Sequence, residues 1–163
     1  MKTLKNAFLC KVERLIVNAV LLLAAIAAAN VQAEEVLKSP NDTRSYLAFK
    51  LANGLRVIVV SDPDAVVAAA SMDVHVGSGD NPPGREGLAH FLEHMLFLGT
   101  EKYPNADEYQ SFIKANGGSN NAYTSFDHTN YYFSISPEFF EPALDRFSRF
   151  FIASAKITKL ATG

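Results

Sequence analysis

The residues L-A-H-F-L-E-H-M-L-F, Leu88 to Phe97, carry two histidines four positions apart. In a helix this spacing places His90 and His94 one turn apart on the same face. Two imidazoles so arranged can hold one metal ion on a rigid support. Glu93 lies between them in sequence, close enough to reach a water molecule on that ion. The pattern is H-x-x-E-H, the inverse of the commoner H-E-x-x-H.

The other residues of this stretch are mainly apolar and are expected to bury the helix. They are Phe91, Leu92, Met95, Leu96 and Phe97. A buried helix with two incidental histidines is the alternative interpretation. We favour the metal site, because an acid at the required position must coincide with both histidines.

The N-terminal residues 1–33 are predicted to be a secretory signal peptide. A basic leader precedes an apolar run from Leu15 to Ala29, and small residues lead up to Ala33, where cleavage is expected. A retained membrane anchor is the alternative, but the run is shorter than the roughly 20 residues that span a bilayer. The exported chain would be secreted or periplasmic, without a stable membrane anchor, and would lack Cys10, the only cysteine.

The rest of the chain is predicted to be an exposed lead-in over 34–45, one domain over 46–153 and a divergent tail over 154–163. The chain of 163 residues is 48% hydrophobic, has a formal net charge of -2 and shows no basic block, so nothing indicates binding to nucleic acid. Alternation and turn signals predict strands at Tyr46–Leu51, Leu55–Val60, Val66–Val76, Asn120–Phe126 and Thr129–Ser136. Helices are predicted at Leu88–Phe97, at Asp107–Ala115 and from Pro137 onward. This order predicts the α+β class, a mostly antiparallel sheet with helices packed on one face.

The two histidines and the acid predict hydrolytic chemistry. A divalent metal held by imidazoles acidifies its bound water, and a neighbouring carboxylate can take the proton and pass it to a leaving amine. His90 and His94 would be the ligands, Glu93 the general base and Zn2+ the metal. A catalytic zinc needs a third protein ligand, and the helix offers two. Further candidates are His75, Asp127 and His128, each of which is more simply interpreted as a strand or turn residue.

Several stretches carry a resemblance to a known family. They are S-D-P-D at Ser61–Asp64, D-V-H-V-G-S at Asp73–Ser78, G-L-A-H-F-L-E-H-M-L-F-L-G-T at Gly87–Thr100, K-Y-P at Lys102–Pro104, N-A-Y-T-S at Asn121–Ser125, H-T-N-Y-Y-F at His128–Phe133 and A-L-D-R-F at Ala143–Phe147. From Val36 to Ala153 the chain resembles the N-terminal domain of the pitrilysin and insulysin family of zinc metalloendopeptidases. Convergence on the same site would not reproduce the flanking strands.

The resemblance implies an inverted zinc site, with His90 and His94 as ligands and Glu93 as the catalytic base. It implies peptide or small-protein substrates that add a strand beside Asn121, Ala122 and Tyr123, for which an ordinary edge strand is the alternative. The family's third ligand, a glutamate, would fall beyond Gly163, and the family's enzymes also use a large second half.

The resemblance therefore predicts a zinc-dependent metalloendopeptidase that needs further C-terminal sequence. The alternative is a truncated, inactive chain that binds metal or peptide only weakly. For the 163 residues alone we expect little turnover and weak zinc retention.

Overall fold

The computed structural model describes residues 32–152. All but the last two residues of the predicted signal peptide lie outside the described residues, as does the tail 154–163. The described part divides into two compact units, which meet between Asp64 and Ala65 in the sequence. Among the helices within 32–152, none has the length and apolar character needed to cross a membrane.

The first unit is a three-stranded antiparallel sheet in the order β1-β2-β3. Its strands are β1 (Gln32–Glu34), β2 (Ser45–Lys50) and β3 (Arg56–Ser61). The turn between β2 and β3 closes through the Leu51 N–H, which donates to the Leu55 carbonyl at 2.8 Å. Strand β1 crosses the predicted cleavage point after Ala33, so cleavage there would leave Glu34 as its last remaining residue.

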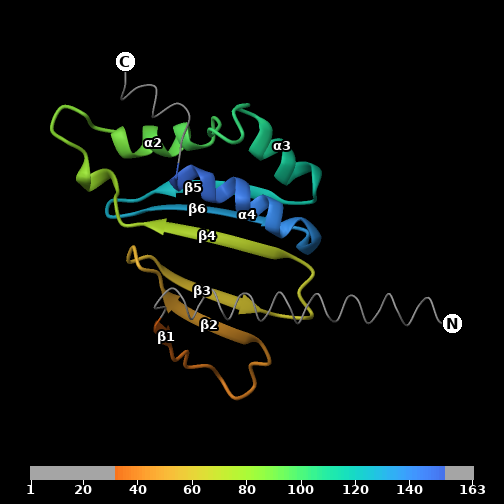
Figure 1. The fold of residues 1–163 in the computed structure, drawn as a ribbon. Helices are drawn as coiled ribbons and strands as arrows, with labels where there is room; N and C mark the ends of the chain where they lie inside the picture. Colours follow the sequence, from red (N-terminus) through yellow and green to blue (C-terminus); the bar gives the residue numbers. More distant parts are fainter. Residues whose placement is uncertain (1–31, 153–163) are drawn as a thin grey trace. The chain divides into compact units, whose positions relative to one another are not determined.

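The second unit combines an antiparallel sheet with helices, as Figure 1 shows. Its strands lie in the order β4-β6-β5, so that β6 is central and β5 is an edge. They are β4 (Ala68–Val74), β5 (Ser119–Thr124) and β6 (Thr129–Ile135). The α-helices are α2 (Leu88–Leu96), α3 (Glu108–Ala115) and α4 (Phe140–Ser148). Short 3-10 helices are η1 (Ser78–Asp80), η2 (Pro137–Phe139) and η3 (Arg149–Phe151).

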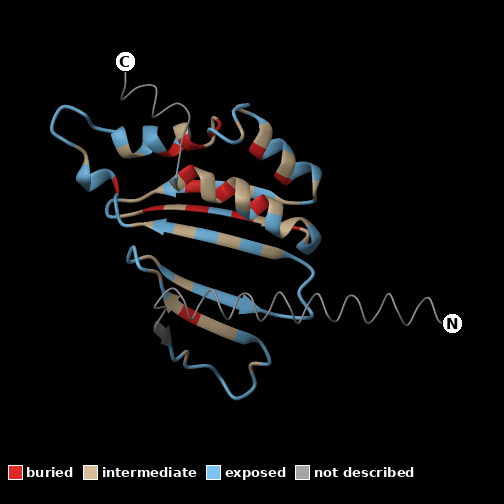
Figure 2. Cartoon of the chain, viewed as in Figure 1, coloured by how far each residue is buried: buried red, intermediate tan, exposed pale blue. Residues whose placement is uncertain are grey.

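The core of this unit lies between the helices and one face of its sheet. Alternate residues of β6 are buried there, and the red positions in Figure 2 follow this alternation. They pack against buried residues of all three helices; the cluster comprises Leu96, Tyr109, Ile113, Ala122, Tyr131, Phe133, Ile135, Ala143, Phe147 and Phe150. The predicted α+β class is therefore confirmed, with strands that form two three-stranded sheets within the described residues.

Helix α2 is less buried than its sequence suggests. The expectation that Phe91 and Leu92 bury the helix is wrong within the described residues, since they remain 56% and 41% exposed. Only Glu93 and Leu96 of α2 are buried. The helix contacts β5 and η1, and Leu96 joins the core cluster of this unit.

Candidate metal centre

Glycines and one asparagine fix the ends of α2. Near its start, the Asn81 side-chain oxygen accepts a hydrogen bond from the Ala89 N–H at 3.0 Å, which satisfies one of the free amides of the first turn. Beyond its end, Gly99 has φ of +106°, and a Cβ there would lie 2.7 Å from the Pro104 carbonyl oxygen. The chain can therefore leave the helix at this point only with glycine.

The helical spacing of His90 and His94 brings their rings together as predicted. Their Nε2 atoms lie 2.7 Å apart, and the rings stack with centroids 4.6 Å apart and planes 25° from parallel. Both residues are exposed. Two nitrogen donors thus converge on one point at the surface of α2, open to solvent and to a ligand.

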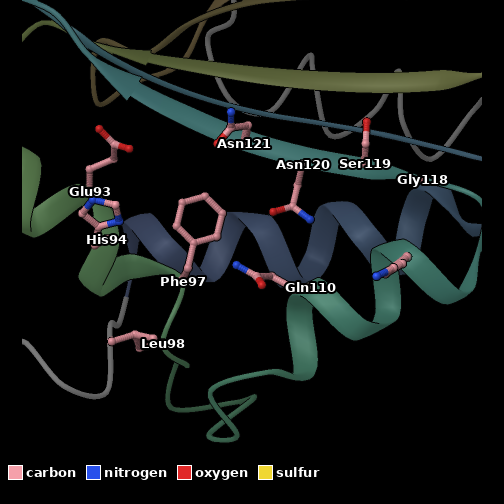
Figure 3. Close-up of a pocket in the computed structure, with 10 residues that line it drawn as sticks. Glu93, His94, Phe97, Leu98, Gln110, Gly118, Ser119, Asn120 and Asn121 are labelled. Carbon is pink, nitrogen blue, oxygen red and sulfur yellow. The ribbon is translucent and has the colours of Figure 1, made fainter.

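Glu93 lies beside these rings but is buried, with 6% of its surface exposed. Its Oε2 accepts a hydrogen bond of 2.5 Å from the Thr124 hydroxyl, at the end of β5. One ligand atom from each of His90, Glu93 and His94 lies within 4.8 Å of the others. Figure 3 shows Glu93 and His94 side by side where α2 approaches β5. Thr124 was not predicted as a site residue, because it lies 31 positions from Glu93 in sequence.

This donor set fits zinc. Zinc binds imidazole nitrogens at about 2.0–2.1 Å, so two nitrogens on one tetrahedral ion lie roughly 3.3 Å apart. The 2.7 Å between the two Nε2 atoms is slightly shorter, and a small rotation of either ring corrects it. Within residues 32–152, this is the one group of three side chains that could hold a metal ion.

The further candidates from the sequence lie outside that group. His75 and Asp127 line a separate pocket of about 190 Å³ together with Phe126. The His128 Nδ1 pairs with an Asp127 carboxylate oxygen at 2.7 Å, which lowers the pKa of Asp127. None of these three residues belongs to the metal group within residues 32–152, and His75 lies just beyond the end of β4, where the sequence predicted that the strand continues.

The predicted substrate strand is an edge strand beside the metal group. Its free edge can be assigned from the turn, where the Ser125 N–H donates to the His128 carbonyl at 2.8 Å. In an antiparallel strand, one residue directs its main-chain N–H and C=O toward the partner strand, and the next residue directs them away from it. Ser125 is of the first kind, and so is every second residue before it. Asn121 and Tyr123 are therefore paired with β6, and the main-chain groups at the free edge belong to Asn120, Ala122 and Thr124.

A groove of about 550 Å³ lies beside the first residues of this strand, Ser119 to Asn121, between β5 and helices α2 and α3. Its walls include Glu93 and His94 from α2, and Gln110 and Lys114 from α3. In Figure 3, Asn120 points from β5 toward the helices, whereas Asn121 points away from them. Sequence reasoning missed Gln110, Lys114 and Asn120, because only the packing of α3 against β5 brings them to the site.

An H-x-x-E-H helix beside a free strand edge, in an α+β fold, is the arrangement of the inverted-motif metallopeptidases. The family model for insulinase, peptidase family M16, matches residues 56–162, and the chain belongs to this family. The resemblance found in the sequence is thereby confirmed.

Individual relatives agree with this assignment. The chain is 52% identical over 119 residues to an insulin-degrading enzyme of Mus musculus, covering 73% of this chain and 12% of the relative. It is 48% identical over 129 residues to a putative zinc protease of Caenorhabditis elegans, covering 79% of this chain and 15% of the relative. The crystal structure of pitrilysin superposes with a TM-score of 0.74 at 38% identity, covering 78% of this chain and 14% of that one. The chain therefore spans about an eighth of the length of these proteins.

Proposed function

We propose that the protein to which this chain belongs is a zinc-dependent metalloendopeptidase that hydrolyses peptides or small proteins. The observation that supports this proposal is the convergence of the His90 and His94 Nε2 atoms, 2.7 Å apart, beside the buried Glu93 carboxylate. His90 and His94 would hold the ion, which when bound would lower the pKa of a water molecule so that it can lose a proton and attack a peptide carbonyl near neutral pH.

Glu93 is the group of this chain that moves the proton. Its carboxylate takes a proton from the attacking water and passes it to the leaving amine as the peptide bond breaks. The Thr124 hydroxyl holds Oε2, which leaves Oε1 as the free acceptor and fixes the plane of the carboxylate. Burial keeps bulk water from competing for that oxygen.

Strand β5 would hold the substrate. An extended peptide that pairs with Asn120, Ala122 and Thr124 lies along the groove, with its backbone fixed by main-chain hydrogen bonds. Because Thr124 also contacts Glu93, this pairing places a peptide bond of the substrate close to the general base. The groups needed for hydrolysis thus come from one helix and one strand edge.

Zinc content tests the ligand assignment. In the full-length protein, we expect His94→Ala to lower zinc affinity by at least about 100-fold, because even the loss of a ligand's hydrogen-bond partner costs 10- to 100-fold. Elemental analysis after dialysis against graded zinc buffers measures this change. His75→Ala is the matched control, since His75 lines a separate pocket. Unchanged zinc affinity in His94→Ala, or peptide hydrolysis that survives complete chelation, would contradict the zinc mechanism.

The compartment is a separate proposal. The basic leader and apolar run before Ala33 support export with cleavage at that residue, which gives a mature chain that begins at Glu34. Intact-mass measurement of the protein purified from its own host is expected to show this N-terminus. A chain that still begins at Met1 would contradict export by this route.

A further inference from the structure

The groove beside β5 carries opposite charges at its two ends. The Glu93 carboxylate lies at the end where Thr124 closes β5, and the Lys114 side chain lines the groove from the last turn of α3. The start of β5 is tied to that turn, because the Gly118 N–H donates to the Ile113 carbonyl at 2.9 Å. The ammonium group and the general base are thus separated along the strand.

Lys114 is a free cation in this groove. It is exposed, and it forms no ion pair with any carboxylate within residues 32–152, where Lys102, Arg44, Arg146 and Arg149 all do. Glu93 and Lys114 are the only Asp, Glu, Lys or Arg residues of the groove wall; the other polar side chains there are His94, beside Glu93 on α2, and Gln110, Ser119, Asn120 and Asn121. The end of the groove away from Glu93 therefore favours an anion.

The register of β5 sets the distance between the two ends. Thr124 and Asn120 are four residues apart on the strand, which corresponds to about 13 Å at 3.3 Å per residue. A peptide paired with this edge directs every second side chain into the groove, on the same face as Asn120 and Thr124. The peptide residue opposite Asn120 thus lies four positions from the one opposite Thr124 and points toward the Lys114 end.

We propose that Lys114 binds a carboxylate of the substrate peptide. The peptide residue that carries this carboxylate lies four positions from the residue opposite Thr124. The carboxylate is either an acidic side chain or the peptide's C-terminus, because both present the same anion to the ammonium group. This inference rests on the proposed function, since it assumes that a peptide pairs with β5. It adds a charge preference at a defined distance from the scissile bond.

The experiment measures peptide binding to the full-length protein in the Glu93→Gln background, where substrate is not consumed. Fluorescence anisotropy compares labelled peptides that carry Glu, Gln or Lys at each position in turn. We expect Glu to bind about two- to fivefold more tightly than Gln at one position at low ionic strength, and the difference to shrink with salt. Lys114→Met abolishes this difference, Lys114→Arg keeps it and Lys114→Glu reverses it in favour of Lys.

Matched controls distinguish an acidic side chain from the C-terminal carboxylate as the ligand of Lys114. They also distinguish failure of this inference from failure of the proposed function. Lys50→Met removes an exposed cation from β2 and is expected to leave the preference unchanged. Amidation of the peptide's C-terminus weakens binding only if the terminal carboxylate is the ligand. Binding that responds neither to Glu in place of Gln nor to amidation, or a response that persists in Lys114→Met, overturns the inference. Failure of the zinc-loaded wild-type protein to cleave any peptide would instead contradict the proposed function, and the binding preference is measured independently of cleavage.

Discussion

Glu93→Gln is expected to lower kcat for peptide hydrolysis by the full-length protein by about 10²- to 10⁴-fold, the range that general acid–base catalysis contributes. Glutamine has nearly the same shape as glutamate, and its amide oxygen can still accept the Thr124 hydrogen bond in the buried site. It cannot take a proton from water. The variant should therefore fold and retain zinc while its chemical step fails.

The measurement pairs steady-state kinetics with zinc analysis. Glu138→Gln is the matched control, because Glu138 is exposed in η2 and belongs to no group that could hold a metal within the described residues. Loss of activity together with loss of zinc would indicate a structural role for Glu93 in the ligand set. A kcat within tenfold of wild type, with zinc retained, would rule out Glu93 as the general base.

The metal group could be predicted from the sequence because it is local. His90, Glu93 and His94 lie within one helical turn, so the 3.6-residue period alone brings their side chains together. Thr124 and Lys114 could not be predicted in this way. Their positions depend on how β5 and α3 pack beside α2, and no periodicity in the sequence specifies which elements become neighbours.

For the fold, as for the site, local features could be predicted from the sequence, whereas the packing between elements could not. Alternation correctly predicts strands β2 to β6, since period two determines which side chains share a face, but the short strand β1 was not predicted. Alternation does not determine partners, and the strands of the described residues form two sheets where one was expected. The apolar character of Phe91 and Leu92 predicts burial, but within residues 32–152 they remain 56% and 41% exposed. Their exposure depends on packing that a local pattern does not contain.

Phe133→Ala is expected to have the largest effect on stability. Phe133 lies at the centre of β6 with 1% of its surface exposed, and its ring packs edge-on against Phe147 with centroids 5.2 Å apart. Its register partners are Ala70 on β4 and Asn120 on β5, and neither can fill the space that a phenyl ring leaves. We therefore expect a loss of about 3–5 kcal/mol in the free energy of unfolding, against a total of about 5–15 kcal/mol for a typical domain.

Urea denaturation of the 163-residue chain, followed by near-ultraviolet circular dichroism, measures this loss. Tyr132→Ala is the matched control, because the neighbouring Tyr132 points to the opposite face of β6 and is 40% exposed. It should cost about 1 kcal/mol or less. A loss below about 1 kcal/mol for Phe133→Ala would contradict the packing of this core. Because Asn120 lies directly opposite Phe133, a loosened core also releases the edge of β5 on which the proposed peptide pairing depends.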